Sequence, residues 1–337
     1  MIASAPSARD TILVTGGAGF IGSNIARALA ADGWRVVVAD WLADGPKWIN
    51  LRDILLDDVI RPEAISAFVE GQGGRLASVV HMGAISATTE RDADKIVARN
   101  IRPTLDLWDQ CARKGIRFIY ASSAATYGDG TEGFTDAQSA AALDRLAPLN
   151  AYGWSKLMAD RRFAADVAAG RPHPPQWAGL RFFNVYGPGE AHKDDMRSVV
   201  HKIYPTAAAG NAVTLFKSHN PAYADGGQLR DFVYVGDCVA VVRWLLETPD
   251  ACGIFNVGTG QARSFADLAK AVFAAAGKEP RITYVDMPVS IRDAYQYFTQ
   301  ADVSKLRAAG FTRPFTPLEE GVRIYITEHL RGRNAAP

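Results

Sequence analysis

A glycine-rich segment directly after a short apolar run constrains the fold of this 337-residue chain most. Residues 11–29 read TILVTGGAGFIGSNIARAL, so a β-branched run leads into the spacing Gly17-x-Gly19-x-x-Gly22 and then into a helical pattern. Glycines at this spacing allow a tight turn, and they let an anion approach the N–H groups at the helix N-terminus. The segment therefore predicts the first strand, phosphate-binding turn and helix of a Rossmann-type unit.

An acidic residue at the end of the second apolar run supports the same interpretation. The run RVVVAD ends at Asp40, 18 residues after Gly22, where a carboxylate can accept hydrogen bonds from the adenosine ribose of a dinucleotide. Asp40 would repel a ribose 2′-phosphate, whereas Lys47 could offset that repulsion. The residues by themselves leave NAD and NADP open.

Short β-branched runs alternate along the chain with segments long enough for crossover helices. This alternation is typical of a parallel sheet covered on both faces, so we predict an α/β fold with a doubly wound Rossmann sheet and a smaller C-terminal substrate-binding lobe. The runs cover residues 11–15, 35–40, 78–83, 117–122 and 179–185. We expect a mainly dinucleotide-binding domain in residues 1–185, a mainly substrate-binding lobe in 186–331 with some chain returning to the sheet, and a frayed tail in 332–337.

The composition argues against several classes of protein. Lys and Arg number 37 and Asp and Glu number 36, so we expect no nucleic-acid or membrane partner. The three cysteines are widely spaced and form no CxxC pair, which favours reduced thiols and no metal site. The N-terminal MIASAPSARD has no apolar core, and no run of 18 apolar residues occurs. We therefore expect a cytoplasmic protein.

A serine, a tyrosine and a lysine have the spacing of an acid/base site. The run ending in YASSAATYG contains Ser123, and Tyr152-Gly-Trp-Ser-Lys156 follows on a predicted helix. Residues four apart share one helical face, so the Lys156 ammonium can lie near the Tyr152 phenol. Lowering a phenol pKa by about three units takes roughly 4 kcal/mol, which Lys156 and an oxidised nicotinamide can supply together. We predict that Tyr152 is a general base and that Ser123 hydrogen-bonds the same substrate oxygen.

The motifs TGGAGFIGSN, YASSAATYG, YGWSK and FNVYGP resemble those of the extended short-chain dehydrogenase/reductases that modify nucleotide-activated sugars. The resemblance covers nearly the whole chain. It implies that Asn100 lies beside the cofactor and that Arg230, in RDFVYVGD, faces a nucleotide diphosphate. The 4,6-dehydratases of this family follow the catalytic hydroxyl with an Asp-Glu pair, whereas Ala124 and Ala125 stand here, so no elimination of water is expected.

Other motifs resemble one branch of that family, the ADP-glycero-manno-heptose 6-epimerases. These are His192-Lys193 after NVYGP, KWINL at 47–51, YQYFTQAD at 295–302 and LRAAG at 306–310. The resemblance implies epimerisation at C6 of an ADP-heptose for the lipopolysaccharide core, by a homo-oligomer with one tightly bound NADP per chain. Departures from the branch are Met82 where Glu is frequent, Trp41 where Asn is frequent, and a longer loop at 217–229.

The charged stretch AHKDDM at 191–196 has two interpretations. Its composition describes a solvated loop, whereas the resemblance makes Lys193 a second acid/base. Inverting an exocyclic carbinol through a ketone exposes opposite faces of the carbon to one fixed cofactor, and rotation about the C5–C6 bond carries the oxygen away from Tyr152. A second acid/base on the far side of the pocket is then required. His192 either orients the substrate or is solvated.

The expected site has three groups of residues. The catalytic group is Tyr152, Lys193, Ser123 and Lys156. The cofactor group adds Gly16, Gly19, Phe20, Ile21, Gly22, Asp40, Trp41, Lys47, Met82, Gly83, Ala84, Ser86, Asn100 and Val185. The substrate group adds Asn184, His192, His201, Phe216, Arg230 and Tyr295.

Two other functions fit part of the sequence. A UDP- or GDP-hexose 4-epimerase rotates the whole sugar and needs only the tyrosine, so Lys193 separates it from the 6-epimerases. A non-catalytic dinucleotide sensor could use the same fold. Such a protein has no need of Ser123, Tyr152 and Lys156, all of which are present.

Overall fold

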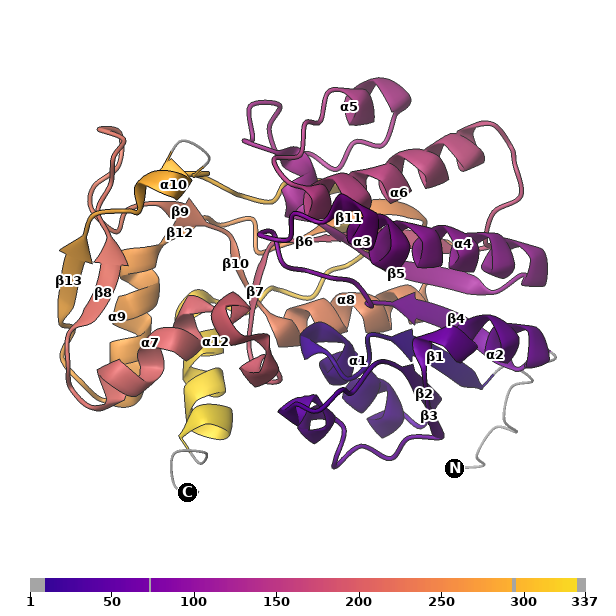
Figure 1. Ribbon diagram of the computed structural model, residues 1–337, viewed down its shortest axis with the longest axis horizontal. Helices are drawn as coiled ribbons and strands as arrows, with labels where there is room; N and C mark the ends of the chain where they lie inside the picture. The colour runs from indigo at the N-terminus through magenta and orange to yellow at the C-terminus, as the bar shows by residue number, and fades with distance from the viewer. Residues whose placement is uncertain (1–9, 73, 293–294, 332–337) are drawn as a thin grey trace. The chain divides into compact units, whose positions relative to one another are not determined.

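The computed structural model describes residues 10–72, 74–292 and 295–331, and these form two compact units (Figure 1). Unit 1 contains the chain up to Gly128, Asp136–Arg181 and Val239–Phe255, and unit 2 contains Asp129–Thr135, Phe182–Cys238 and the chain from Asn256 onward. The chain thus leaves unit 1 at Arg181, near the expected boundary at 185, and later returns to it. The expected frayed tail lies outside the described residues.

Unit 1 is built on a seven-stranded sheet in the order β11-β6-β5-β4-β1-β2-β3. β1 lies between β2 and β4 and is parallel to both, and the pairs β2–β3 and β4–β5 are also parallel. The prediction of an α/β doubly wound sheet is therefore confirmed. The strands are β1 (Thr11–Thr15), β2 (Arg35–Ala39), β3 (Asp58–Ile60), β4 (Leu76–His81), β5 (Arg117–Ser123), β6 (Trp177–Phe182) and β11 (Gly253–Val257).

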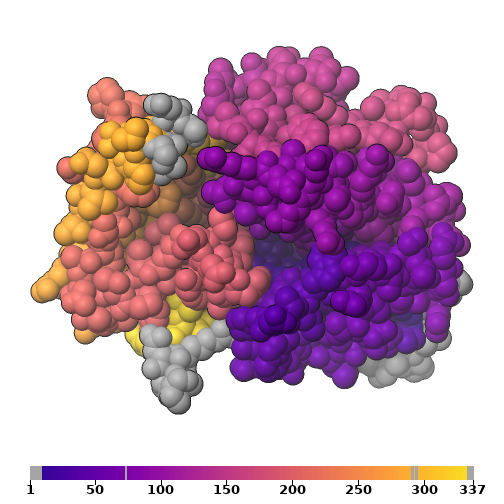
Figure 2. All heavy atoms as spheres, in the orientation of Figure 1, coloured from indigo at the N-terminus to yellow at the C-terminus, as the bar shows by residue number. Residues whose placement is uncertain are grey.

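Alternate residues of these strands face a core beneath two long helices. Leu13 and Val79 of the strands pack with Trp108 of α4 and Phe163 of α6 in one buried cluster, as the two-residue period of a strand requires. The Trp108 and Phe163 rings stack at 3.9 Å. The helical elements are α1 (Phe20–Ala31), η1 (Pro46–Asn50), η2 (Pro62–Ala64), α2 (Ile65–Gly71), α3 (Ala93–Ile96), η3 (Val97–Ile101), α4 (Arg102–Lys114), η4 (Ala124–Tyr127), α5 (Ala140–Asp144) and α6 (Ala151–Ala168). Figure 2 shows the described N-terminal part of this unit, indigo to purple, on one face of the molecule.

The fifth apolar run differs from its prediction. Residues 179–185 do not form one strand, because β6 ends at Phe182 and β7 (Asn184–Tyr186) pairs with β10 in unit 2. Between them, Phe183 N–H donates to the Val257 carbonyl. The third run, expected at 78–83, ends as β4 at His81, so Met82 and Gly83 lie in the loop that follows.

Unit 2 packs three helices against short two-stranded sheets. Its core includes Tyr204 of α7, Phe273 of α9, Val322 of α12 and Phe232 of β10. Ser264 and Asp267 form a reciprocal capping box at the start of α9, which satisfies N–H groups that the helix cannot pair internally. The elements are η5 (Ala191–Met196), α7 (Val199–Ala208), β8 (Val213–Phe216), β9 (Leu229–Arg230), β10 (Phe232–Tyr234), α8 (Val235–Glu247, returning to unit 1), β12 (Arg263–Ser264), α9 (Phe265–Ala276), β13 (Ile282–Val285), α10 (Val289–Arg292), α11 (Ser304–Ala308), α12 (Leu318–Ile324) and η6 (Tyr325–Leu330).

Two searches of the described residues bear on function. None of the helices there is long and apolar enough to cross a membrane. Nor do three or more His, Cys, Asp or Glu side chains gather in these residues in a way that could hold a metal ion.

Candidate active site

The glycine turn between β1 and α1 requires residues without a side chain. Gly16 has a φ of 63°, and a Cβ there would lie 2.6 Å from the Gly83 Cα. A Cβ on Gly22 would lie 2.2 Å from the Gly16 carbonyl oxygen. Gly19 is the N-cap of α1 and provides no side-chain cap. This bare turn at a helix N-terminus fits the pyrophosphate of a dinucleotide.

Asp40, directly after β2, stabilises this turn through a hydrogen bond and forms an ion pair with Lys47. Its carboxylate is 7% exposed. The Oδ2 atom accepts from Ala18 N at 2.9 Å, and the Oδ1 atom lies 2.5 Å from Lys47 Nζ. Asn50 Nδ2 donates to the Ala18 carbonyl at 3.0 Å. The negative charge that would repel a 2′-phosphate is therefore offset by Lys47.

Trp41 follows Asp40 and is held on two sides. The Arg99 guanidinium lies 4.3 Å from the centre of its ring, and Trp41 Nε1 donates to Glu63 at 3.0 Å. Trp41 remains 39% exposed. A flat exposed ring fixed by a cation–π contact and a hydrogen bond suits stacking against an aromatic ligand.

The loop after β4 is clamped by Asn100, on the π-helical segment η3. Asn100 is 2% exposed; it accepts from Ile85 N at 2.8 Å and donates to the Ile85 carbonyl at 3.0 Å. It also donates to Ser155 Oγ on α6 at 3.3 Å. The loop holds the expected cofactor residues Met82, Gly83, Ala84 and Ser86.

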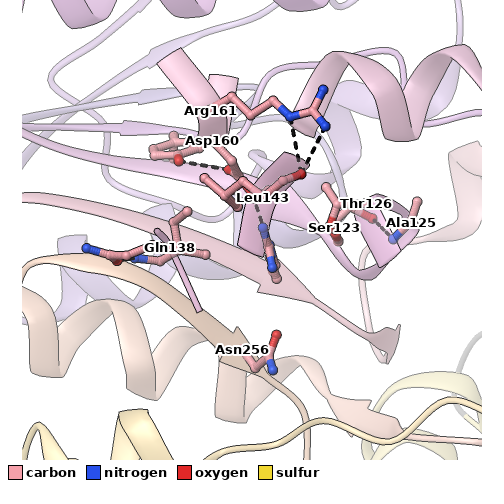
Figure 3. A network of polar contacts seen from close by, with 12 residues as sticks. Ser123, Ala125, Thr126, Gln138, Leu143, Asp160, Arg161 and Asn256 are labelled. Atoms are coloured by element: carbon pink, nitrogen blue, oxygen red, sulfur yellow. Dashed lines mark hydrogen bonds and ion pairs between the residues drawn. The ribbon is translucent and has the colours of Figure 1, made fainter. Parts of the chain in front are cut away.

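Ser123 and Tyr152 meet where β5 ends and α6 begins. Ser123 Oγ accepts from Ala125 N at 3.1 Å and so caps η4 (Figure 3). A Cβ on Gly153 would lie 2.6 Å from the Ala125 carbonyl oxygen, so this glycine lets α6 approach that turn. Burial raises the pKa of Tyr152, and its hydrogen bond with Ser123 opposes the rise. A bound cation must lower it before the phenol can act as a base near neutral pH.

Lys156 lies one turn after Tyr152, and its Nζ is 5.9 Å from the centre of the Tyr152 ring. Burial lowers the pKa of Lys156 to about 8, and the charge of Asp160 opposes that fall. Asp160 is fully buried and accepts from Tyr120 OH at 2.9 Å and Ser122 Oγ at 3.0 Å. It also pairs with fully buried Arg181, whose Nε lies 2.9 Å from Asp160 Oδ2.

His81, which ends β4, was not among the expected site residues. Its Nδ1 lies 2.6 Å from Thr15 Oγ1 and its Nε2 lies 2.9 Å from Thr104 Oγ1. Burial, and secondarily the charge of Lys156, lowers the pKa of His81 to about 3. The ring is therefore neutral and joins the ends of β1 and β4. The sequence pattern that could have identified His81 is a polar residue at the end of an apolar run.

In unit 2, Lys193 lies on the 3₁₀ segment η5 and is half-buried. Burial lowers its pKa, and the charge of Glu190 opposes the fall. Asp194 and Asp195 beside it are exposed. Lys193 is thus less exposed than the two aspartates that follow it.

Glu190 and His201 belong to one cluster beneath this segment. Glu190 is 1% exposed and accepts from Ser198 N at 2.5 Å and Ser198 Oγ at 2.6 Å. Tyr325 makes a further hydrogen bond to Glu190, and the Tyr325 hydroxyl lies 2.8 Å from His201 Nδ1. Sequence reasoning named His201 but missed Glu190.

Arg230 is 8% exposed and is paired with no carboxylate in the part of the chain that the structure describes. Its guanidinium lies 5.2 Å from the centre of the Tyr295 ring and 5.7 Å from that of Phe265. Burial lowers its pKa, and Tyr295 and Tyr223 oppose the fall. A buried cation among aromatic rings favours an anionic ligand. The two expected substrate residues Arg230 and Tyr295 are thus brought together.

The other expected residues of unit 2 are less engaged with one another. Asn184 is exposed on β7 beside Val185, which was expected at the cofactor. Phe216 ends β8 and is 37% exposed, and His192 lies in η5 beside Lys193.

Residues 12–258 match the model of the NAD dependent epimerase/dehydratase family. The chain is 48% identical over 325 residues to the ADP-L-glycero-D-manno-heptose-6-epimerase of Nitratidesulfovibrio vulgaris, covering 94% of this chain and 97% of that protein. It is 43% identical over 329 residues to the ADP-L-glycero-D-manno-heptose-6-epimerase of Fusobacterium nucleatum, covering 95% and 98%.

Solved structures show the same likeness. The ADP-L-glycero-D-manno-heptose-6-epimerase of Helicobacter pylori is 28% identical with a TM-score of 0.77, covering 97% of each chain. The UDP-glucose 4-epimerase of Thermus thermophilus, in complex with NAD, is 29% identical with a TM-score of 0.73, covering 96% of this chain and 99% of that one.

Proposed function

Because the chain belongs to the NAD dependent epimerase/dehydratase family, we propose that it is an NAD(P)-dependent ADP-L-glycero-D-manno-heptose 6-epimerase. It inverts the carbinol at C6 of the ADP-heptose through a ketone and supplies the heptose of the lipopolysaccharide core. The observation that carries this proposal is a second lysine, the half-buried Lys193, in addition to the Tyr152–Lys156 pair. A ring 4-epimerase needs one acid/base, whereas inversion at an exocyclic carbon needs two.

The residues of unit 1 fit a nicotinamide dinucleotide. The bare turn at Gly16, Gly19 and Gly22 would hold the pyrophosphate, and Asn100 holds the loop that lines its path. A dinucleotide bound there would supply the hydride acceptor and donor for C6. We propose NADP, because the Lys47 ammonium beside Asp40 supplies a cation where a 2′-phosphate would lie.

Tyr152 acts on one orientation of the substrate. Its phenolate removes the proton of the C6 hydroxyl as the carbon is oxidised, and Ser123 hydrogen-bonds the same oxygen. Lys156, positively charged at neutral pH, stabilises the phenolate. Its charge depends in turn on Asp160.

Lys193 acts on the other orientation. After rotation about C5–C6, the Lys193 ammonium gives its proton to the C6 oxygen as the carbon is reduced, which leaves a neutral amine. Before the next turnover Tyr152 gives its proton to water and the amine takes one from water. Arg230 holds the diphosphate, because it is a buried cation with no carboxylate partner among the described residues.

Incubation of the purified protein with ADP-D-glycero-D-manno-heptose, followed by NMR of C6, tests the proposal. Inversion at C6 with loss of activity in Lys193→Met supports it. Inversion at a ring carbon of a UDP-hexose, unaffected by Lys193→Met, would instead establish the 4-epimerase.

A further inference from the structure

The segment that carries Lys193 has a strained backbone. Asp194 has φ 45° and ψ −120°, a combination that residues with a side chain rarely adopt. Its carbonyl accepts from Arg197 N at 3.2 Å and from Arg197 Nε at 2.7 Å. Such a conformation persists only where the surrounding structure holds it. The contacts that hold this segment therefore also fix the position of the Lys193 Cα atom, from which the side chain extends.

Glu190 holds the other end of the segment. Its carbonyl accepts from Lys193 N at 3.0 Å, so the two residues share one 3₁₀ turn. Its carboxylate is 1% exposed and accepts hydrogen bonds from Ser198 N, Ser198 Oγ and Tyr325. Burial raises the pKa of this carboxyl, and the hydrogen bonds from Ser198 and Tyr325, together with the charge of Lys193, oppose the rise. An ionised carboxylate accepts but does not donate, so the three donors stabilise that form.

We propose that Glu190 is a positioning residue for Lys193, and that its buried negative charge keeps the lysine side chain as an ammonium within the fixed 191–196 segment. This inference rests on the proposed function, in which Lys193 exchanges a proton with the C6 oxygen. Glu190 itself needs no contact with the substrate.

The charges around Lys193 support this role. Burial disfavours the ammonium, and Glu190 is the described charge that opposes this effect. Glu190 also meets Tyr325, whose hydroxyl lies close to His201 Nδ1. Asp194 and Asp195 carry negative charge but are exposed to water, where screening weakens their effect. Glu190 is therefore the nearby charge that acts through a medium of low polarity.

The proton balance fixes the direction of the effect. When Lys193 protonates the C6 oxygen, an N–H bond breaks and an O–H bond forms, and Glu190 stabilises the state before the transfer. Replacing its charge with a neutral amide lowers the pKa of Lys193. In a plot of kcat against pH, the limb that reflects the titration of Lys193 then moves to lower pH. This direction is the same whether the lysine serves as acid or as base.

Glu190→Gln in the full-length holoenzyme tests the inference. We expect this limb of the kcat profile to move down by about one pH unit, with up to about tenfold lower turnover above it and with KM nearly unchanged. The half-reaction of Tyr152, followed as reduction of the bound nicotinamide by substrate, should keep its own pH dependence. A lower turnover with an unmoved limb would overturn the inference.

Ser198→Ala is the matched control. It removes one donor to Glu190 and the cap of α7 but keeps the carboxylate charge, so stability should fall while the limb does not move down as far. If the limb moves equally in both variants, Glu190 only stabilises the structure of the segment and its charge does not act on Lys193. If Glu190→Gln does not fold, Glu190→Asp should move the limb the same way by less, because it withdraws the carboxylate by one methylene; an unmoved limb there overturns the inference.

Direct titration of Lys193 separates this inference from the proposed function. The reactivity of its amine toward an acylating reagent is measured against pH by mass spectrometry, in the wild type and in Glu190→Gln. A wild type that does not invert C6 would end the proposed function, yet the amine of the variant should still titrate at lower pH. Identical titrations in the two proteins would refute the role of Glu190 even if the wild type is an epimerase.

Discussion

Unit 1 holds a buried lysine and unit 2 a half-buried one, and in each case a carboxylate nearby in sequence supports the charge of the lysine. In unit 1, Asp160 follows Lys156 by one turn of the 18-residue helix α6 and is tied to fully buried Arg181. In unit 2, Glu190 precedes Lys193 on a short 3₁₀ segment and is tied to Ser198 and Tyr325. A lysine and the carboxylate that stabilises its charge can therefore be positioned in two ways. In unit 1 a regular helix within the core positions them, and in unit 2 a strained loop does so with hydrogen bonds from other elements.

Tyr152→Phe should have the largest effect, because it removes the ionisable oxygen of unit 1. General acid/base groups contribute about 10²–10⁴-fold, so C6 inversion and the half-reaction should both fall by at least that factor. Cofactor binding, measured by dialysis and chromatography of the released nucleotide, should persist. Unchanged turnover would place the base elsewhere.

Lys193→Met should remove the acid/base group of unit 2 and leave that of unit 1 active. Net inversion should fall by about 10²–10⁴-fold, whereas Tyr152 should still oxidise the epimer whose hydroxyl it faces. The measurement is the bound-nicotinamide absorbance after addition of each epimer. If both epimers reduce the bound nicotinamide at the wild-type rate, Lys193 is a solvated loop residue and not an acid/base.

Asp160→Asn should show that the carboxylate of unit 1 also stabilises the fold. Loss of one partner of a buried ion pair costs about 3–5 kcal/mol, because the Arg181 charge stays buried. Urea unfolding gives the free energy of unfolding, with Asp53→Asn as control. Arg27 and Asp53 form an exposed pair, and that variant should lose less than about 0.5 kcal/mol. Equal losses in the two variants would contradict the prediction.

His81 should make unit 1 sensitive to acid. Its pKa is lowered from 6.5 to about 3 in the folded protein, so the unfolded chain takes up a proton first as the pH falls. The contribution of the neutral ring is fully present above pH 6.5 and is lost between 6.5 and 3, by about 1.4 kcal/mol per pH unit. Stability measured from pH 7 to pH 4 should fall less steeply in His81→Gln than in the wild type. Parallel curves would mean that His81 is not the acid-sensitive group.

Lys47→Met should have the smallest effect and concerns unit 1 alone. Removing the cation beside Asp40 restores the repulsion of a 2′-phosphate, so the Kd for NADP should rise by about tenfold, or about 1.4 kcal/mol, while the Kd for NAD stays nearly constant. Calorimetric titration of both nucleotides into cofactor-free protein gives this ratio. An equal loss for both would mean that Lys47 only fastens the turn.

Much of unit 1 follows from local patterns. The run TILVT became β1 residue for residue, and the glycine spacing led into α1 as expected. Tyr152 and Lys156 lie on one helix because their spacing matches the helical repeat. The edge strand β3 was missed because DVI is short and partly exposed, which leaves little alternation to detect.

Unit 2 was harder to predict. The run ending at residue 185 divides at Phe183 because its last part finds a partner in β10, which lies far away in the sequence. Glu190 was passed over because it is one of three acidic residues in the charged stretch 190–195, and the sequence does not distinguish a buried carboxylate from exposed ones.

The sequence by itself determined the features that depend on short-range spacing: the bare turn at Gly16–Gly22, the helical face shared by Tyr152 and Lys156, and the alternation of strands and helices. Steric limits and backbone hydrogen bonding act over a few residues, so such patterns can be recognised locally. Only the tertiary structure decided which charges lose contact with water and what they meet. Arg181 reaches Asp160 across 21 residues and His201 meets Tyr325 across 124. Because pKa depends on this burial and pairing, the protonation of His81, Lys156 and Lys193 is a property of the folded chain.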